Sequence, residues 1–399
     1  MKKLAIVIQR CHEKIVGGSE AEAWHYGNLL KESYEIHILT TTAVDFERWD
    51  NVLPEGDEKK DGICIKRFRV SQGRAEYWEE IHRQLLDEFA GLKSKSNRST
   101  KSVKRLIEWP TALQEEFIYK QGPYSDDLMD FLSEKSEDYK AIIFLTYLYP
   151  TTYFGMFQVP RDKIIFVPTL HDEPPAYLSV YKYMAKRSRI ILWNTDSEYR
   201  FSKLLWGELP GCVVGMGVET KEFPPAKLNF PYIIYCGRID INKGCPQLVN
   251  YFLKFKEDCP SNLHLVLTGD NKIGLPRNDD IVFKGSVSEE EKLKLMSGAS
   301  IFIMPSPNES FSIVTLEAMA QKTPVLASDG SEVIIDHIKK SGGGLLYNNY
   351  EGFKAGINFL LENKEEARDM GERGRNYVIE NYNVKKIFKK LKEKVEAIE

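Results

Sequence analysis

Residues 305–320 read Pro-Ser-Pro-Asn-Glu-Ser-Phe-Ser-Ile-Val-Thr-Leu-Glu-Ala-Met-Ala, and they predict the junction of a strand with a helix. The apolar run 301–305 is typical of a buried strand, and helical residues begin near Ser310 to Ser312. The loop between strand and helix carries Glu309. Strand, loop and helix in this order form the repeating unit of a parallel sheet flanked by helices. The junction therefore predicts an α/β fold.

The same alternation of strand-like and helix-like segments extends along almost the whole chain. The expected strands are 4–9, 35–41, 63–70, 141–148, 163–169, 190–195, 232–236, 263–268, 281–284, 301–305 and 324–328. Residues 74–137 interrupt this order with a polar, aromatic and helical pattern, which we interpret as an insertion.

A proline-rich segment divides the chain. Residues 219–231 contain Pro224, Pro225 and Pro231 and no periodic apolar pattern, so they are typical of a linker. We expect one domain over 1–215, a second over 216–380, and a C-terminal helix over 381–399 that returns to the first domain. Two Rossmann-like, doubly wound domains joined in this way predict a cleft between the carboxyl ends of their sheets.

Composition excludes several classes of protein. The chain has 399 residues with 55 basic and 58 acidic side chains, and its net charge of −3 argues against a nucleic-acid partner. No apolar run approaches the roughly 20 residues of a membrane-spanning helix, and the apolar N-terminus is too short for a signal peptide. The 6 cysteines form no Cys-x-x-Cys pair and are expected to be reduced. We therefore expect a cytoplasmic globular protein.

Two carboxylates belong to the 305–320 junction. Free N–H groups at the start of a helix attract anions, so this helix start suits a phosphate. Glu317 follows Glu309 by eight residues, which is about 12 Å along a helix. At that distance the two carboxylates cannot share a metal, but they could hold hydroxyls at opposite ends of an extended ligand. The alternative is structural: Glu309 caps the helix and Glu317 is solvated.

Two cations follow an earlier strand. Arg238 and Lys243 lie in Cys-Gly-Arg-Ile-Asp-Ile-Asn-Lys-Gly, residues 236–244, between an expected strand and an expected helix. Fixed cations at this edge could neutralise a diphosphate, most of all while it departs with growing negative charge. A surface turn with solvated charges is the alternative.

The first domain offers weaker signals. Gly17 and Gly18 let the backbone approach a ligand closely, and Ser19 with Glu22 fits a helix capping box. His171 follows an expected strand, where a structural hydrogen-bonding role is the alternative. The chain has no Asp-x-Asp, His-x-x-x-His or Gly-x-Ser-x-Gly motif. A metal held by the protein and a serine hydrolase are therefore unsupported.

Together these motifs resemble the retaining glycosyltransferases of family 4, the glycosyl transferases group 1, which have the GT-B fold. The resemblance rests on the Glu309 and Glu317 pair, on Gly-Arg and Lys-Gly at 237–238 and 243–244, on Phe-Lys-Gly-Ser-Val at 283–287 and on Gly17-Gly18. It covers nearly the whole second half and, more loosely, the start of the first.

The resemblance implies that the second domain binds a UDP- or GDP-linked sugar and the first binds a glycan or lipid-linked acceptor. No cofactor or metal is implied. Transfer would retain configuration, with the leaving phosphate accepting the acceptor's proton. The implied catalytic residues are His171, Arg238, Lys243 and Glu309. The implied donor-binding residues are Gly17, Gly18, Arg238, Lys243, Lys284, Val287, Glu309, Ser310, Phe311, Ser312 and Glu317.

Within that set the resemblance assigns roles. Arg238 and Lys243 would hold the diphosphate, and Glu317 the ribose. The backbone from Lys284 to Val287 would hold the base. Glu309 would contact the donor sugar, and His171 would touch the sugar that is transferred.

This sequence departs from the family pattern at three places, and these departures bear on the identity of the donor more than on the reaction class. Ser312 and Lys322 stand where the family usually has glycine, and a left-handed backbone at Lys322 would cost up to about 1 kcal/mol. Asp-Gly-Ser-Glu at 329–332 is a shortened form of a Gly-Gly-x-Pro-Glu stretch. A nucleotide-sugar epimerase and a non-catalytic nucleotide-sugar-binding protein of the same fold are the alternative functions. Neither half carries the dinucleotide fingerprint of a dehydrogenase.

A basic segment bears on the acceptor. Residues 93–105 contain six Lys or Arg side chains and no acidic ones. One hypothesis is peripheral contact with the anionic inner face of a membrane that carries a lipid-linked acceptor. The alternative is a solvated loop.

Overall fold

The computed structural model describes residues 1–12, 17–96 and 106–398. The chain forms two compact units, Met1–Gly215 with Phe388–Glu399 and Met216–Ile387. We refer to them as the N-terminal and the C-terminal unit. The basic segment 93–105 lies outside the residues whose side chains are described, so its membrane contact stays a hypothesis.

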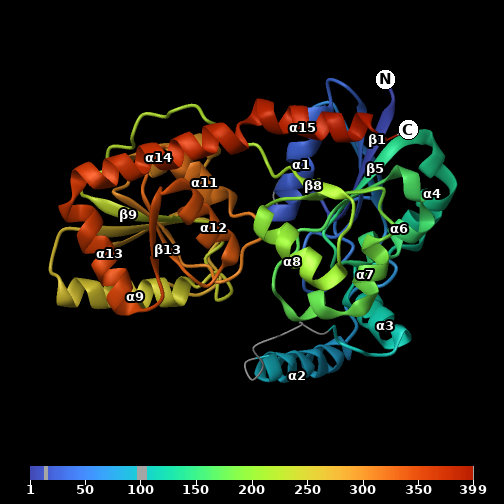
Figure 1. Ribbon diagram of the computed structural model, residues 1–399, viewed down its shortest axis with the longest axis horizontal. Coiled ribbons are helices and arrows are strands. Elements are labelled where there is room, and N and C mark those ends of the chain that lie inside the picture. The colour runs from blue at the N-terminus through green and yellow to red at the C-terminus, as the bar shows by residue number, and fades with distance from the viewer. Residues whose placement is uncertain (13–16, 97–105, 399) are drawn as a thin grey trace. The chain divides into compact units, whose positions relative to one another are not determined.

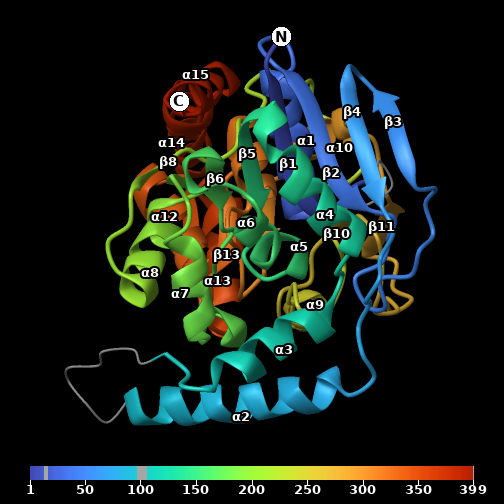
Figure 2. The ribbon, with the colours of Figure 1, turned by 90° about the vertical axis from the view of Figure 1, so that its right-hand side faces the viewer.

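The N-terminal unit is built on an eight-stranded sheet with the order β3-β4-β2-β1-β5-β6-β7-β8. Neighbouring strands are parallel except β3 and β4. Figure 2 shows this sheet with β1 between β2 and β5. The strands are β1 Lys3–Arg10, β2 Glu35–Thr41, β3 Gly56–Lys60, β4 Ile63–Phe68, β5 Tyr139–Leu145, β6 Ile164–Val167, β7 Ile190–Trp193 and β8 Gly211–Val213.

Helices connect these strands. They are α1 Gly18–Leu30, α2 Trp78–Ser96, α3 Thr111–Gln121, α4 Asp126–Lys135, α5 Pro150–Tyr153, α6 Gly155–Gln158, α7 Ser179–Ala185 and α8 Asp196–Trp206. Three single turns of 3₁₀-helix cover Ser136–Asp138, Arg161–Lys163 and Pro174–Tyr177. Helix α2 lies beside α3 (Figures 1 and 2). The expected helical pattern of 74–137 thus corresponds to α2, α3 and α4.

The C-terminal unit has a six-stranded, all-parallel sheet with the order β11-β10-β9-β12-β13-β14. Its strands are β9 Tyr232–Cys236, β10 His264–Thr268, β11 Ile281–Gly285, β12 Ile301–Met304, β13 Val325–Ser328 and β14 Gly344–Tyr347. Its helices are α9 Cys245–Asp258, α10 Glu289–Gly298, α11 Ile313–Ala320, α12 Glu332–Ser341, α13 Tyr350–Glu362 and α14 Lys364–Tyr382.

Both faces of this second sheet are buried. Ile234 of β9 packs in one core with residues of α10, α11 and α12. Its neighbours Ile233 and Tyr235 point to the opposite face and pack with α9 and α13 (Figure 1). Strands buried on both faces consist of continuous apolar runs, which is the pattern that the sequence showed. The predicted α/β, doubly wound fold is confirmed.

Three strands escaped prediction, each for a physical reason. Strand β3 is Gly-Asp-Glu-Lys-Lys, an exposed edge strand with no apolar residue to mark it. Strand β8 has only 3 residues. Strand β14 follows two glycines and is short and only partly buried.

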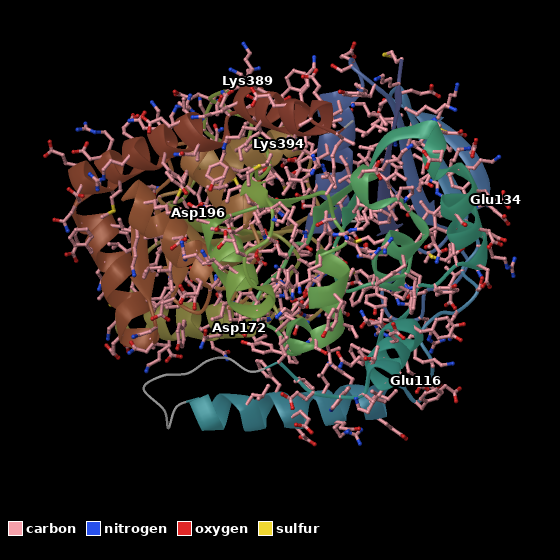
Figure 3. The ribbon with its side chains drawn as sticks, turned by 45° about the vertical axis from the view of Figure 1, so that its right-hand side comes forward. Glu116, Glu134, Asp172, Asp196, Lys389 and Lys394 are labelled. Atoms are coloured by element: carbon pink, nitrogen blue, oxygen red, sulfur yellow. The ribbon has the colours of Figure 1, made fainter. Side chains whose placement is uncertain are left out.

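The chain ends in α15, Val384–Glu396, which follows α14 after one residue. Ile387, Leu391 and Val395 are buried and recur every four residues, so they form one apolar stripe. Figure 3 shows Lys389 and Lys394 on this helix. Over the described residues, no helix combines the length and the apolar composition that a bilayer crossing would need.

Candidate functional site

The carboxyl edge of the C-terminal sheet holds most of the residues that the sequence singled out. The strand order runs β11-β10-β9 on one side and β12-β13-β14 on the other, so the connections turn in opposite directions from β9 and β12. Ligands of open α/β sheets bind at such a switch point. The loop after β9 carries Arg238 and Lys243, and the loop after β12 carries Glu309.

Gly244 holds these two loops together. Its backbone has φ +71°, in the left-handed region, and it precedes the first residue of α9. A Cβ at this position would lie 2.5 Å from the carbonyl oxygen of Pro305, at the end of β12. Glycine therefore permits both the turn and the close approach. The approach places Lys243 beside the loop that carries Glu309.

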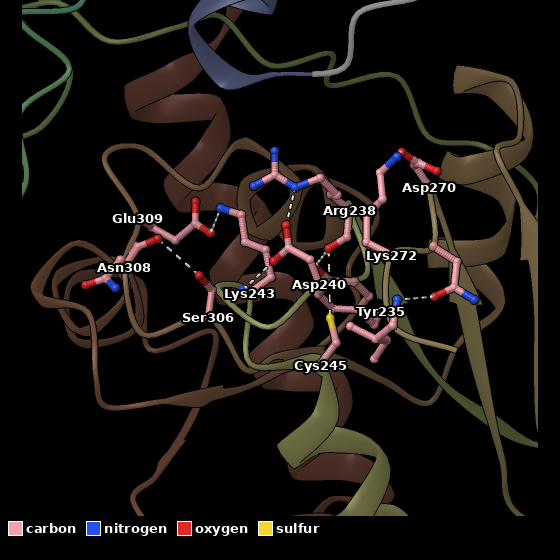
Figure 4. Close-up of polar contacts among 12 residues, drawn as sticks. Tyr235, Arg238, Asp240, Lys243, Cys245, Asp270, Lys272, Ser306, Asn308 and Glu309 are labelled. Atoms are coloured by element: carbon pink, nitrogen blue, oxygen red, sulfur yellow. Dashed lines mark hydrogen bonds and ion pairs between the residues drawn. The ribbon is translucent and has the colours of Figure 1, made fainter. Parts of the chain in front are cut away.

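The cations of the site are paired with carboxylates (Figure 4). Lys243 Nζ lies 2.6 Å from Glu309 Oε1. Arg238 Nε pairs with Oδ2 of Asp240, and the other oxygen of that carboxylate accepts a hydrogen bond from the Lys243 backbone N–H at 2.8 Å. Asp240 therefore links the two cations. The sequence analysis did not assign it a role, although it lies between them in the same motif.

Glu309 does not cap the following helix, so the structural alternative for it is wrong. Helix α11 begins at Ile313, and its N-cap is Ser312, whose side chain makes no capping hydrogen bond. The Ser312 backbone is left-handed with φ +60°, and its Oγ lies 2.8 Å from Oγ1 of Thr315. Phe311 is buried, and its carbonyl oxygen lies 3.0 Å from Nε2 of His337. Ser310 and Phe311 thus belong to a fixed loop.

The Glu317 side chain is only 12% exposed and is ion-paired, so the interpretation as a solvated helix residue is wrong. Lys292 Nζ of α10 lies 2.8 Å from Glu317 Oε2 and 2.7 Å from Glu289 Oε2. Burial raises the pKa of Glu317 and the charge of Lys292 opposes that rise. Burial also lowers the pKa of Lys292, but the two carboxylates outweigh it and the pKa ends above its usual value.

The charges of Lys292 and Glu317 also act on the thiol at the end of β9. Burial raises the pKa of the Cys236 thiol to about 12, with Lys292 lowering and Glu317 raising it. Cys236 is the last residue of β9. The buried pair therefore lies near the start of the loop that carries Arg238. Lys292 was missed because a lysine in an acidic helix gives no sequence signal of its own.

Lys284 and Val287 flank the carboxyl end of β11, the edge strand of the same sheet. The Lys284 side chain is exposed and Val287 is half-buried. Ser288 then caps α10 by accepting a hydrogen bond from the Glu291 N–H at 3.2 Å. The expected base-binding segment thus lies at the same edge as Arg238.

In the N-terminal unit the capping-box prediction is wrong. Helix α1 starts at Gly18, its N-cap is Gly17, and Ser19 lies inside the first turn. Glu22 is buried and accepts a hydrogen bond from Nδ2 of Asn194 at 3.2 Å. A Cβ on Gly18 would meet no atom within 4 Å, so the space beside it is open.

His171 lies on the loop after β6, next to Asp172, which Figure 3 labels. Its Nε2 is 3.3 Å from Oε2 of Glu173, and Oε1 of that carboxylate accepts a hydrogen bond from the Tyr147 hydroxyl at 2.6 Å. Burial would raise the pKa of Glu173, but the interactions with His171 and Tyr147 outweigh it and lower the pKa. Glu173 was missed although it is two residues from His171. Thr169, with φ +52°, turns the chain before them.

Metal ligation gains no support from this geometry. Throughout residues 1–12, 17–96 and 106–398, three or more His, Cys, Asp or Glu side chains nowhere gather in a way that could hold a metal ion.

Sequence comparisons identify the C-terminal unit. Residues 218–377 match the family model described as glycosyl transferases group 1. An uncharacterized glycosyltransferase of Methanocaldococcus jannaschii is 24% identical over 84% of this chain and 83% of its own length. The alpha-maltose-1-phosphate synthase of Mycolicibacterium smegmatis is 28% identical over 43% of this chain and 52% of its own.

Solved structures share the fold of the whole chain. Sucrose-phosphate synthase from Thermosynechococcus elongatus aligns with a TM-score of 0.69 and 16% identity, over 99% of this chain and 98% of its own. Trehalose-6-phosphate synthase from E. coli, bound with UDP-2-fluoro glucose, aligns with 0.65 and 13% over 100% and 99%. Residues 218–377 therefore match the glycosyl transferases group 1 family model, and the whole chain shares the GT-B fold of these solved glycosyltransferase structures.

Proposed function

We propose that this protein transfers a hexose from a nucleoside-diphosphate donor to a glycan or lipid-linked acceptor with retention of configuration and without a metal. One observation carries the proposal. Arg238, Lys243 and Glu309 meet on the two loops that flank the switch point of the C-terminal sheet. Two cations at such a point match the two phosphates of a nucleotide sugar.

Departure of the diphosphate is the step that these cations would promote. Arg238 pairs with Asp240, and Lys243 pairs with Glu309. A bound diphosphate would replace these carboxylates as partner of the cations. Its charge grows as the bond to the sugar breaks, so the cations bind the transition state more strongly than the substrate. Glu309, once released by Lys243, would be available to accept hydrogen bonds from the hydroxyls of the donor sugar.

The remaining residues would bind and position. Glu317, paired with Lys292, suits the two ribose hydroxyls because a carboxylate accepts two hydrogen bonds. In the N-terminal unit, Glu173 holds the ring of His171, the residue that the resemblance places at the transferred sugar. The resemblance implies no nucleophile among these groups, so we assign the proton of the acceptor hydroxyl to the leaving phosphate.

The donor screen should start with UDP- and GDP-linked hexoses. UDP-glucose occupies a solved structure of Anabaena HepE, which shares this fold with a TM-score of 0.67 and 14% identity over 99% of both chains. Mass spectrometry of the purified protein with each donor would detect the free nucleoside diphosphate released by slow attack of water. The correct donor is expected to be hydrolysed without any acceptor.

Binding provides an independent test. At a concentration of about 100 times its Kd, the nucleoside diphosphate should stabilise the fold by about 2.7 kcal/mol, a shift in Tm of about 5 °C or more. Arg238→Ala should remove most of this shift. Arg368→Ala is the matched control, because Arg368 is 69% exposed on α14. A chain that neither binds any nucleoside diphosphate nor hydrolyses any donor would contradict the proposal.

The same screen separates the alternatives. An epimerase of this fold would convert the donor into a different nucleotide sugar without any acceptor. A non-catalytic binding protein would bind the donor and leave it intact, and the left-handed Ser312 beside the sugar position is the observation that favours it.

A further inference from the structure

Arg74 in the N-terminal unit is a partly buried cation that the function proposed above does not use. It precedes α2, and its guanidinium carbon lies 4.5 Å from the ring centroid of Trp78. The Trp78 ring is itself fixed, because it is 8% exposed and its Nε1 donates a hydrogen bond to the Phe117 carbonyl oxygen at 3.2 Å. Arg74 therefore rests on a rigid aromatic surface.

The backbone of Arg74 is also held in place. Its N–H donates to the Arg48 carbonyl oxygen at 3.2 Å. The preceding residue, Gly73, approaches the same carbonyl so closely that a Cβ would lie 2.4 Å from it. Gly122 packs against Gly73 in turn, where a Cβ would lie 2.8 Å from the Gly73 carbonyl carbon. Arg74 is thus part of a packed loop rather than a free surface arm.

The guanidinium of Arg74 makes no ion pair and no hydrogen bond with any residue of 1–12, 17–96 and 106–398. Its Nε is shielded from water and has no acceptor. The neighbouring carboxylate of Asp45 does not supply one, because it already accepts four backbone N–H groups of the loop 47–50. Stacking on Trp78 satisfies the face of the guanidinium but leaves the buried Nε–H without an acceptor.

Arg74 and the His171–Glu173 pair act on the same side chains. Burial lowers the pKa of His82, with Arg74 lowering it further and Glu173 raising it, so His82 is within electrostatic reach of both. His82 stacks on Trp78 with ring centroids 4.5 Å apart. Burial raises the pKa of Tyr149 to about 12, and Glu173 and Arg74 also act on it. Arg74 and the His171–Glu173 pair therefore flank the same two side chains.

A partly buried cation with a shielded, unpartnered N–H favours the binding of an anion that can pair with it. We infer that Arg74 is the anion-binding residue of the acceptor site, and that the acceptor carries a phosphate or carboxylate group near the hydroxyl that receives the sugar. Identifying the ligand as the acceptor rests on the function proposed above. The anion site itself rests only on Arg74, Trp78 and His82.

Inorganic phosphate is the first probe. Isothermal titration would use the full chain carrying Arg238→Met and Lys243→Met, which remove the two cations of the C-terminal unit. Phosphate should bind saturably, and adding Arg74→Met should weaken binding about tenfold or more, because charge-assisted hydrogen bonds are lost. Arg74→Lys should bind with intermediate affinity, because it keeps the charge and loses the two-pronged geometry.

Arg48→Met is the matched control, since the Arg48 side chain is exposed on the neighbouring loop, between β2 and β3, and its loss should leave phosphate binding unchanged. An unchanged Tm would show that each variant is folded. If Arg74→Met does not fold, Arg74→Lys takes its place in the test. Absence of saturable phosphate binding, or equal binding after Arg74→Met, would overturn the inference.

Matched acceptors then identify the anion in the otherwise unmodified chain with its donor. Glucose against glucose 6-phosphate tests phosphate, and glucose against glucuronate tests carboxylate. One anionic acceptor should exceed glucose about tenfold or more in kcat/KM, and Arg74→Met should abolish that preference while donor hydrolysis continues. Equal use of all three sugars would overturn the inference.

The two hypotheses fail in different ways. Donor hydrolysis combined with phosphate binding that ignores Arg74 would refute the anion site and leave the proposed function intact. Phosphate binding that requires Arg74 in a chain that turns over no donor would refute the proposed function and leave the anion site standing.

Discussion

Arg238 in the C-terminal unit and Arg74 in the N-terminal unit are both partly buried, but their surroundings differ. Arg238 pairs with Asp240 within its own loop. Arg74 has an aromatic ring beneath it and no carboxylate in contact among the described residues. A paired cation is stable before its ligand arrives and must exchange one anion for another. An unpaired cation gains its first anion from the ligand.

Buried carboxylates show the same contrast. Glu317 of the C-terminal unit has Lys292 as counter-ion. Glu22 of the N-terminal unit instead lies near a second carboxylate, Glu198, which accepts hydrogen bonds from the backbone N–H groups of Leu170 and Asn194. Burial raises the pKa of Glu22 to about 8 and that of Glu198 to about 7. In the C-terminal unit Glu317 thus has a lysine as its partner, whereas in the N-terminal unit Glu22 lies near a second carboxylate and Arg74 makes no ion pair within the described residues.

The largest expected effect concerns exchange at the paired site. Lys243→Met should lower the rate of donor hydrolysis by about 10²-fold or more, because one of two groups that stabilise the departing diphosphate is lost. Lys272→Met is the matched control, since Lys272 is 58% exposed and pairs with Asp270 at the same sheet edge. Equal loss in both variants would show that general charge, rather than the Lys243–Glu309 pair, is responsible.

The next effect concerns the unpaired carboxylate Glu22. Its pKa in the folded chain, about 8, exceeds its ordinary value of 4.5, so the folded state binds more protons between these values. The free energy of unfolding therefore falls as pH rises from about 4.5 to about 8. Glu22→Gln is neutral at every pH and should be more stable than the parent at pH 8.5 by about 4 kcal/mol, with a difference below about 1 kcal/mol at pH 5.

Urea unfolding of the N-terminal unit at the two pH values measures this difference. Glu32→Gln, an exposed substitution just after the same helix, is the control and should not change the pH dependence. If the free energy of unfolding of Glu22→Gln fell with pH as steeply as that of the parent, Glu22 would be ionised throughout the pH range. The contrast with Glu317 would then be lost.

A smaller effect tests the buried pair of the C-terminal unit. Lys292→Met removes the charge that opposes the raised pKa of Glu317, so the pKa of that carboxyl rises further. Protonation of Glu317 near neutral pH should weaken nucleoside diphosphate binding about tenfold. The affinity should recover as the pH increases, because Glu317 then loses its proton. Titrations between pH 6 and 9 measure it, with Lys294→Met on the same helix as control. A pH-independent loss would indicate a structural role only.

The smallest effect concerns backbone conformation at the end of α11. Lys322 has φ +64°, so the left-handed backbone considered from the sequence is confirmed. Lys322→Gly should raise the free energy of unfolding by up to about 1 kcal/mol, reduced by the loss of exposed ion pairs to Glu222 and Glu372. Thermal unfolding measures it, and Lys322→Ala, which loses the same ion pairs without relieving the backbone, should destabilise.

Sequence patterns predicted the fold well because continuous apolar strands such as β9 and β12 are recognisable without knowledge of their partners. They also located Arg238, Lys243 and Glu309, which lie in loops directly after such strands. Which charged side chains lie next to one another could not be predicted. Lys292 and Glu317 come from different helices, and Glu22 meets Glu198 across 176 residues of chain.

Arg74 illustrates the same limit. In the sequence it is one basic residue in a polar, aromatic segment, and nothing there shows that its neighbours leave it without an acceptor. Only the packing of Gly73, Gly122 and Trp78 around it reveals this. Residue types and spacing thus identify chemistry near strand ends, while unpaired or self-paired charge is a property of the folded chain.

Diphosphate recognition by Arg238 and Lys243 is tested most directly by isothermal titration of nucleoside diphosphates against the corresponding monophosphates. Under the proposed function, the second phosphate should strengthen binding about tenfold or more, because it would replace Asp240 and Glu309 as partner of the two cations. Equal affinities for diphosphate and monophosphate would contradict the account, since the two cations would then have no role in holding the leaving group.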